Sequence, residues 1–343
     1  MKKIYITVDT ECHDINQVNS YIWGKVKDKE YGIKFILEQG KKYNIPINFF
    51  FDMCESFRYG QEYSKEIIET IRKYNQPIYL HIHPNYISGN DDKSFLWQYT
   101  KEEQKDILRK GFQQYCDLLG KEKCAAFRVG RYAACLEMYE CLQELGVETI
   151  DLSYCYNNHK MCHLYFDEIN VINRPKIFKG QTVLPNTRFV CLDFLGVKKS
   201  LNTDVHEATL QEIKEVLKEE SLEHVVLTMH SWHFIDKAFY RKKIRGDKRQ
   251  IKKFNKLIQY CLNKGFEFDR IENLTYRDNC SEELLTEKEI NNCRGVRGKI
   301  KSLFFNFSRF QEIAKLNKKY FFIYAGFYST IILALLILLI VLL

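Results

Sequence analysis

The stretch Lys3-Ile-Tyr-Ile-Thr-Val-Asp-Thr-Glu11 decides the fold, because it is an apolar, β-type run that ends on two carboxylates. Its β-branched and aromatic residues favour an extended strand. Similar runs follow it, and they alternate with segments whose apolar residues recur at helical spacing. This alternation favours parallel βαβ units, so we expect an α/β fold.

The alternation extends over residues 1–278, and seven or eight such units suit a (β/α) barrel, complete or incomplete. Strands are predicted over 3–8, 47–52, 77–83, 125–129, 148–152, 189–194, 224–230 and 266–271, and helices over 33–43, 64–74, 101–119, 136–145, 210–220 and 248–264. A doubly wound open sheet is the alternative. No glycine-rich phosphate loop follows the first strand, which weighs against a nucleotide-binding version.

The composition places the chain among ordinary globular proteins. Its 343 residues are 45% hydrophobic and 28% charged, which excludes a disordered or collagen-like chain. The 12 cysteines include no CxxC pair, so free thiols are expected rather than a zinc ribbon. The net charge is +8, yet segment 291–320 alone holds eight basic residues and one acid. The rest is nearly neutral, and no nucleic-acid partner is expected.

The C-terminal segment 320–343 carries no charge and ends in a run of Ile, Leu and Val. About 20 apolar residues span a bilayer, so a C-terminal transmembrane helix is predicted, with a buried core helix as the alternative. Lysines precede this segment, no charge follows it, and the N-terminus has no apolar signal region. These features predict a single-pass C-terminal anchor in the cell membrane with a cytoplasmic catalytic body.

Between the body and this segment, residues 279–319 are predicted to form a basic, partly amphipathic juxtamembrane linker. A helix that packs on the body is the alternative. The apolar positions that recur at helical spacing in this linker are Leu303, Phe304, Phe307, Phe310, Ile313 and Ala314.

Two acids end the first strand. Asp9 and Glu11 lie at i and i+2 on an extended segment, so their side chains share a face. Neighbouring carboxylates both stay ionised only if a cation lies between them or each has its own partner. A helix-capping Asp with a solvated Glu is the alternative interpretation.

Two histidines end the third strand, where His81 and His83 precede Pro84 and also share a face. Such a pair can bind a divalent metal. Together with a carboxylate it forms a site with open positions for water, a common arrangement in hydrolytic zinc sites. Core histidines without a ligand role are the alternative.

Other predicted strands end on polar residues as well. Arg128 can hold a carboxylate in place and keep it ionised. Asp151 follows the fifth strand, and His230, across the barrel mouth from the acids, is placed to protonate a leaving group. Functional residues of a barrel gather where strands end and loops begin, so one shared site is expected.

In this order the motifs resemble those of the polysaccharide deacetylases, carbohydrate esterase family 4. The five matching motifs span about residues 4–234 and are Thr7-Val-Asp9-Thr-Glu11, Leu80-His81-Ile-His83-Pro84, Phe127-Arg128-Val-Gly-Arg131-Tyr132, Asp151-Leu-Ser153 and Leu227-Thr-Met-His230-Ser231. The resemblance implies a distorted (β/α) barrel with a divalent metal, usually zinc. It also implies the removal of N- or O-acetyl groups from sugars.

The resemblance further implies a role for each candidate residue. These are the metal ligands Glu11, His81 and His83, the base Asp9 with Arg128 orienting it, the acid His230, and the substrate-binding residues Tyr132, Asp151 and Trp232. Core packing is the alternative for Trp232. The family usually spaces its two histidines by four, which here leads to Asn85, so either His83 or Asn85 takes the second place.

The predicted protein is therefore a metal-dependent hydrolase that removes acetyl groups from an N-acetylated sugar or envelope polysaccharide precursor at the membrane. Its expected cofactor is a divalent metal ion, and zinc is the first candidate. Its expected partner is a carbohydrate, and the anchor suggests a lipid-linked one. The alternatives are another metal-dependent hydrolase of non-peptide C–N bonds, and a non-catalytic carbohydrate-binding scaffold with a degenerate site.

Overall fold

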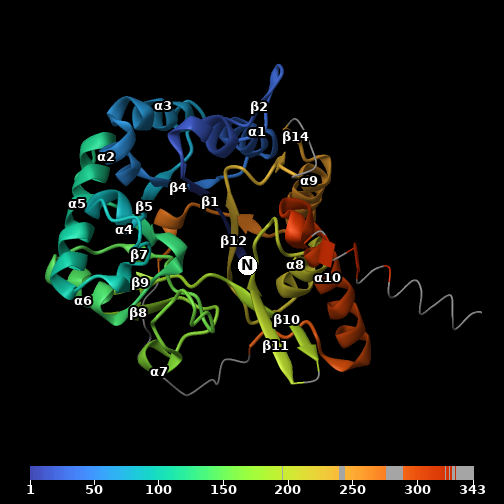
Figure 1. Ribbon diagram of the computed structural model, residues 1–343. Coiled ribbons are helices and arrows are strands. Elements are labelled where there is room, and N and C mark those ends of the chain that lie inside the picture. The colour runs from blue at the N-terminus through green and yellow to red at the C-terminus, as the bar shows by residue number, and fades with distance from the viewer. Residues whose placement is uncertain are drawn as a thin grey trace, which may run out of the picture.

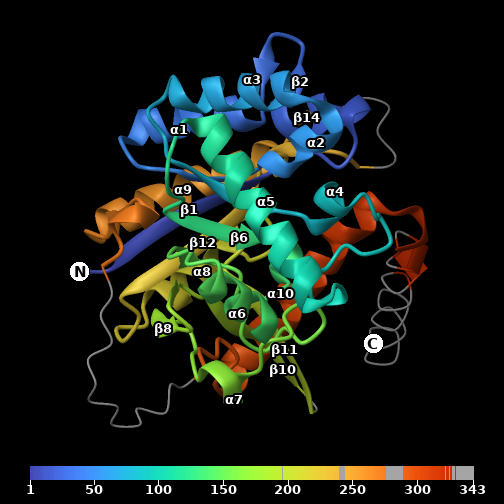
Figure 2. The same ribbon diagram turned by 90° about the vertical axis from the view of Figure 1, so that its left-hand side faces the viewer.

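The computed structural model describes residues 1–194, 196–238, 244–275, 289–320, 322–323, 325–326 and 329. At its centre, a nine-stranded sheet curls into an incomplete barrel with helices around the outside (Figures 1 and 2). All its neighbouring strands are parallel except β8 and β9. In spatial order the strands are β12 (His224–His230), β1 (Lys3–Thr10), β4 (Asn48–Asp52), β5 (Ile78–Ile82), β6 (Ala126–Val129), β7 (Ile150–Asp151), β9 (Gln181–Val183) and β8 (Lys176–Phe178), and β15 (Glu267–Phe268) also pairs with β1.

Helices connect the parallel strands, as the alternation in the sequence predicts. The longer ones are α1 (Ile33–Tyr43), α3 (Gln61–Arg72), α5 (Lys101–Leu119), α6 (Leu136–Glu144), α8 (Leu210–Leu217), α9 (Lys248–Asn263) and α10 (Gly295–Leu316). Short elements are α2 (Ser56–Tyr59), α4 (Pro84–Ser88), α7 (Phe166–Ile169) and the hairpins β2 (Lys25–Val26) with β3 (Lys29–Glu30) and β13 (Ile235–Asp236) with β14 (Arg245–Gly246).

A further hairpin, β10 (Arg188–Phe194) with β11 (Val197–Asn202), forms a separate two-stranded sheet. On one side Val205 N donates to Thr228 O of β12 at 2.8 Å. On the other side Asn186 N donates to Tyr154 O, in the segment after β7, at 3.1 Å. The segments that flank the hairpin are thus joined to β12 and to the loop after β7 by a few backbone hydrogen bonds rather than by continuous strand pairing, which agrees with the expected distorted barrel.

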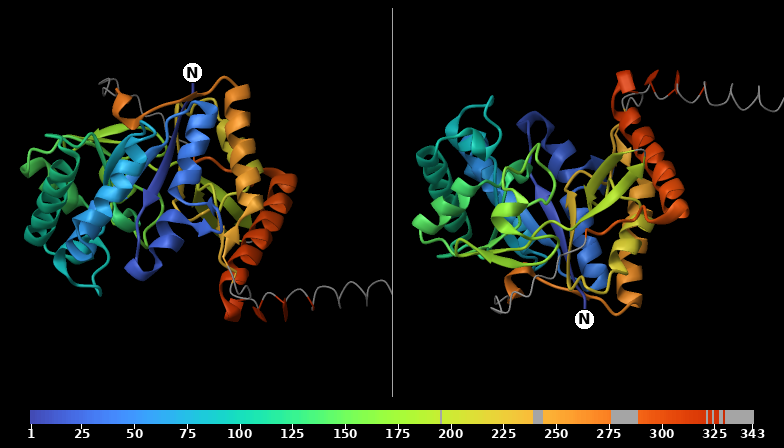
Figure 3. Two further views of the ribbon diagram at one scale, coloured as in Figure 1. Left: turned by 90° about the horizontal axis from the view of Figure 1, so that it is seen from above. Right: turned by 90° about the horizontal axis from the view of Figure 1, so that it is seen from below.

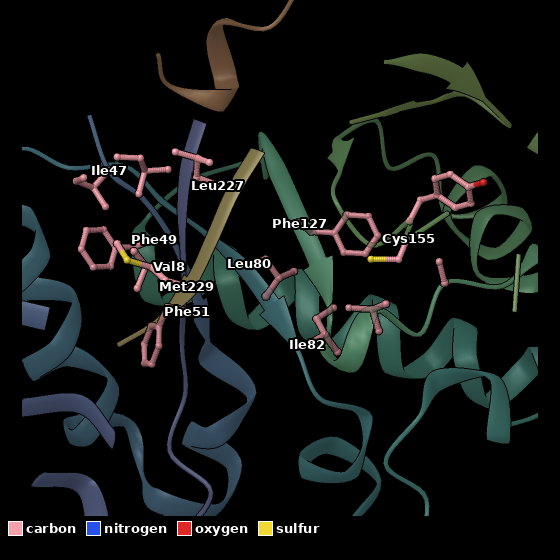
Figure 4. Close-up of a cluster of buried hydrophobic side chains, with 14 of the residues drawn as sticks. Val8, Ile47, Phe49, Phe51, Leu80, Ile82, Phe127, Cys155, Leu227 and Met229 are labelled. Carbon is pink, nitrogen blue, oxygen red and sulfur yellow. The ribbon is translucent and has the colours of Figure 1, made fainter. Parts of the chain in front are cut away.

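Alternation along the strands separates an outer from an inner layer of side chains. The outer layer packs under the helices, and its members include Val8, Phe49, Phe51, Leu80, Ile82, Phe127, Leu227 and Met229 (Figure 4). The inner layer is offset by one position and includes Tyr5, Phe50, Tyr79, Ala126 and Val226. With a period of two, the inner rows continue to Asp9 on β1, His81 on β5 and His230 on β12. The barrel interior is therefore apolar along the strands and polar at their carboxyl ends.

The predicted transmembrane element is corrected by the structure. Among the described residues no helix is both long enough and apolar enough to cross a membrane. The longest of them, α10, has 22 residues but carries charged side chains along its length, which a bilayer core disfavours. Most of segment 320–343 lies outside the described residues. The described residues therefore show a distorted barrel, and the predicted transmembrane helix, with the membrane anchor and cytoplasmic body inferred from it, is not found among them.

The predicted linker contains α10, which contacts the body on the same side as α9 (Figure 3). Asn306 Nδ2 donates to Cys191 O of β10 at 2.9 Å. Arg309 Nη1 lies 2.7 Å from Glu212 Oε2 of α8, and both side chains are buried. Of the apolar positions in this helix, Ala314 is buried while Phe304 stays exposed. Helix α10 therefore packs on the body, which was the alternative interpretation.

Replacing Arg309 by Met should destabilise the protein by about 3 kcal/mol, because it leaves the buried Glu212 carboxylate without its cation. This value is at the low end of the usual cost of breaking a buried ion pair, because Thr209 continues to donate hydrogen bonds to Glu212 Oε2. Denaturant unfolding of both proteins measures the difference. Lys299→Met, at an exposed position of the same helix, is the control and should change stability little. Equal stability of the two variants would contradict the tight docking of α10.

Candidate active site

The carboxyl ends of four strands bring the candidate residues together. Across the β1–β12 ladder Asp9 is opposite His230, and across β5–β6 His81 is opposite Arg128. Glu11 and His83 directly follow β1 and β5. A pocket of about 420 Å³ lies over these strand ends. It is lined by Asp9, Glu11, His13, His81, His83, Arg128, Arg131, Tyr132, Asn158, Met161, Arg188, Ser200, Leu201, Asn202, Asp204, Glu207, His230 and Trp232.

Three buried ligand groups face one another on one side of this pocket. Glu11 Oε2 lies 3.4 Å from His81 Nε2 and 2.5 Å from His83 Nε2. The ligand atoms of the three residues all lie within 4.8 Å of one another. Apart from these two imidazole contacts, Glu11 Oε2 is buried without a hydrogen-bond donor among the described residues. A divalent cation between the three ligand atoms would satisfy this oxygen.

The hydrogen bonding of His81 prepares it as a ligand. His81 Nδ1 lies 2.9 Å from the carbonyl oxygen of Arg128, which can only accept, so Nδ1 carries the proton and donates. In the neutral ring, Nε2 then presents its lone pair toward Glu11. A backbone carbonyl that fixes the ring in this way is the usual partner of a metal-binding histidine. The donor set therefore fits a divalent metal such as zinc.

The electrostatics of Glu11 agree with a charged ligand. Burial opposes ionisation of this carboxyl group, but His83 and His81 outweigh burial and hold its pKa well below its usual range. Asn85, the alternative to His83, instead donates from Nδ2 to Asp91 Oδ1 at 3.1 Å. The structure thus places His83, and not Asn85, beside Glu11.

The Asp9 carboxylate is paired with a cationic side chain, that of Arg128. Arg128 is fully buried, and its Nη1 lies 2.5 Å from Asp9 Oδ1. Arg128 is held in turn by Thr7 Oγ1 at 3.1 Å and Asn186 Oδ1 at 3.3 Å. The two acids at the end of β1 therefore have separate partners, Arg128 for Asp9 and the two histidines for Glu11, as two ionised neighbours require.

His230 lies between the ligand cluster and a second polar cluster. Its Nε2 is 3.6 Å from Glu11 Oε1, and its Nδ1 is 3.2 Å from His233 Nε2. The backbone N of His230 donates to His233 Nδ1 at 3.2 Å, so a neutral His233 carries its proton on Nε2 and donates it to His230 Nδ1. Burial lowers the pKa of His233 well below its usual range, which keeps that ring neutral. The proton of a neutral His230 is then on Nε2, toward the pocket.

Of the three predicted substrate-binding residues, two line the pocket. Tyr132 and Trp232 do so, and the Trp232 ring stacks on the His230 ring with centroids 4.4 Å apart. Asp151 is fully buried and is not among the lining residues. Its carboxylate accepts hydrogen bonds from Tyr139 OH and, at 2.9 Å, from Ser153 N, so it holds the end of β7 and the loop after it.

The structure adds residues that the sequence analysis did not single out. Asp204 and His233 form a group with His230 whose ligand atoms lie within 4.8 Å of one another. His13 Nε2 is 3.6 Å from Glu11 Oε1, and Arg188 also lines the pocket. A second histidine three positions after His230 was a visible signal. Asp204 and Arg188 carried no such signal in the sequence. Arg188 begins the irregular β10–β11 hairpin and Asp204 follows it.

Gly130 leaves room for the His83 ring, because a Cβ at this position would lie 2.6 Å from His83 Nε2. Gly130→Ala should therefore displace a ligand side chain and weaken metal binding by about 10–100-fold, the scale seen when groups that orient ligands are changed. Competitive titration with a chelator measures this. Gly89→Ala is the control, since nothing lies within 4 Å of its added Cβ and only its positive φ of 73° is strained. Equal metal affinity in all three proteins would show that the His83 ring is not a ligand.

Comparison with known proteins adds structural likenesses only. No protein-family model matches the sequence, and no similar curated protein is found. A protein from Mycobacterium smegmatis assigned to the polysaccharide deacetylases matches with a TM-score of 0.45 at 12% identity, over 80% of this chain and 94% of that one. A polysaccharide deacetylase from Bacillus cereus matches with a TM-score of 0.41 at 12% identity, over 82% and 94%. A carbohydrate esterase family 4 pseudoenzyme from Bacillus anthracis matches with a TM-score of 0.41 at 12% identity, over 79% and 64%.

These structures carry the name of the family that the sequence motifs resemble. At such identities and TM-scores the likeness does not decide the activity of this chain, which depends on its own site residues.

Proposed function

We propose that this protein is a metal-dependent hydrolase that removes the acetyl group from an N-acetylated sugar. One observation carries the proposal. A carboxylate paired with its own buried cation, Asp9 with Arg128, lies in the same pocket as the Glu11, His81 and His83 cluster. A proton acceptor beside a metal site with open positions is the arrangement that hydrolysis of an amide requires.

The proposed role of each residue follows from its contacts. Glu11, His81 and His83 would hold a divalent cation, which when bound polarises a carbonyl group and lowers the pKa of a water molecule. Asp9 would accept the proton of the attacking water, and Arg128 holds the Asp9 carboxylate in place and ionised. His230 would act as the acid in its cationic form, in which both ring nitrogens carry a proton: it would give the Nε2 proton to the departing amine and return to the neutral ring.

Two aromatic residues would position the sugar. Trp232 and Tyr132 both line the pocket, and aromatic faces suit the apolar face of a sugar ring. The backbone N–H of Tyr132, in the turn after β6, would add a donor for the developing oxyanion.

The test is the product of the reaction. The purified protein with one equivalent of zinc is incubated with chitin oligosaccharides, and acetate and free amine are measured together. Equal amounts of both are expected, and removal of the metal with a chelator should stop the reaction. Release of ammonia or another acid from a different amide, with no acetate, would favour the other C–N hydrolase. No product from any amide would favour a non-catalytic scaffold.

A further inference from the structure

The pocket contains two arginines that the proposed chemistry does not use. Arg188 begins β10 and is only 8% exposed, and its contacts through Nη are to neutral acceptors. Its Nη1 donates to Asn202 Oδ1 at 2.6 Å and its Nη2 to Ser200 O at 3.1 Å. Its Nε is buried without a hydrogen-bond partner. A buried guanidinium group normally has a counter-anion, so Arg188 is incompletely satisfied by the protein alone.

Arg131 is the second of these arginines. It lines the same pocket from the turn after β6, and its side chain is exposed, with Cζ 5.7 Å from the centroid of the Phe95 ring. Its φ of 58° lies in the left-handed region, which is strained for a residue with a large side chain. Strain of this kind persists where surrounding structure enforces it, commonly at binding sites. Among the described residues, neither Arg131 nor Arg188 forms an ion pair.

The acids of the pocket do not neutralise these two arginines. Asp9 is paired with Arg128, and Glu11 faces the two histidines of the metal cluster. Asp204 lies beside His230 and His233. Glu207 is the remaining acid in the lining. Among the described residues, neither Asp204 nor Glu207 forms an ion pair with Arg131 or Arg188, so both guanidinium groups lack a counter-anion within the protein.

We propose that the pocket takes an N-acetylated sugar that also carries an acidic group, a carboxylate or a phosphate, which Arg188 and Arg131 bind. This inference rests on the proposed function and specifies its substrate class. A guanidinium group donates two parallel hydrogen bonds to either anion, so the shared chemistry is a planar or tetrahedral oxyanion on the sugar. The experiment distinguishes a sugar carboxylate from a sugar phosphate.

The first measurement compares kcat/KM for N-acetylglucosamine, N-acetylmuramic acid, which adds a carboxylate, and N-acetylglucosamine 6-phosphate. We expect at least one acidic sugar to exceed the neutral one by about tenfold or more, as a charge-assisted hydrogen bond allows. Whether the carboxylate or the phosphate gives the larger ratio identifies the anion. Ratios of one or less for both acidic sugars would overturn the proposal.

Variants assign the preference to the two arginines. Arg131→Gln and Arg188→Gln should each lower the acidic-to-neutral ratio severalfold, whereas Glu207→Gln should raise it. Lys160→Gln, an exposed residue of the neighbouring loop that does not line the pocket, is the control and should keep the wild-type ratio. If Arg188→Gln fails to fold because Asn202 and Ser200 lose their donor, Arg131→Gln at its exposed position still decides. An unchanged ratio in Arg131→Gln would contradict its role.

A binding measurement separates this inference from the proposed function. Calorimetric titration of the same three sugars into the zinc-loaded protein does not require turnover. Tighter binding of an acidic sugar without any acetate release would support the anion site while the deacetylase proposal fails. Acetate release with equal affinity for acidic and neutral sugars would support the deacetylase and overturn the anion site.

Discussion

Asp9→Asn is expected to lower the rate of acetate release by about 10²–10⁴-fold, the usual contribution of a general base, while metal content stays at the wild-type level. The amide cannot accept the proton of the attacking water at neutral pH. Asp9 is not one of the three clustered ligand groups but is paired with Arg128, so its loss leaves the metal ligands in place. The measurements are acetate production and metal analysis of the same sample.

Stability must be followed in this variant. Arg128 is fully buried, and without the Asp9 charge it keeps only neutral acceptors such as Thr7 Oγ1 and Leu152 O. Thermal unfolding shows whether the variant is folded at the assay temperature. Asp92→Asn, at an exposed position, is the matched control and should leave activity at the wild-type level. Activity of Asp9→Asn within a few-fold of wild type would remove Asp9 as the base.

The second large effect is the loss of the metal. Glu11→Gln and His81→Ala are each expected to weaken zinc binding by more than about 100-fold, because even groups that only orient a ligand contribute about 10–100-fold. Glu11→Gln keeps the shape of the side chain but removes the negative charge that faces His81 and His83. Both variants should also lose hydrolysis, since the site would no longer hold the cation.

Metal analysis after dialysis against a weak chelator measures this loss, with competitive titration for the residual affinity. His159→Ala removes an exposed histidine outside the pocket lining and serves as the control, with unchanged zinc content. Full zinc occupancy in Glu11→Gln and His81→Ala would place the metal elsewhere and remove the basis of the proposed chemistry. The pattern of metal lost in these variants and retained in Asp9→Asn separates ligand from base.

Regular elements with strong periodicity were predictable from the sequence. Helices α1 and α5 begin and end where they were predicted. In α5 the start is marked by a capping box, in which Thr100 Oγ1 accepts from Glu103 N and Glu103 Oε2 accepts from Thr100 N. The short strand β7 and the polar β11 were harder, because two residues or a run such as Val-Lys-Lys-Ser carry little hydrophobic pattern.

Helix α10 shows where local composition misleads. The long uncharged run after it predicts a membrane span, and no helix of the described residues meets the requirements for one. The basic helix α10 was assigned to a membrane surface, whereas its Arg309 meets a buried carboxylate of α8. Periodicity shows that a helix has an apolar face, but it does not show what covers that face.

The amino-acid order alone determined which side chains share a face at each strand end, because the two-residue period of a strand is a local property. Asp9 with Glu11, and His81 with His83, follow from it. Only the tertiary structure decided which of these groups meet across the barrel mouth, and it placed Arg128 on Asp9, Glu11 between the histidines and Asp151 outside the pocket lining. It also brought in Asp204 and Arg188 through an irregular hairpin. Strand register and barrel closure are set by packing between distant segments, and no local pattern encodes that contact.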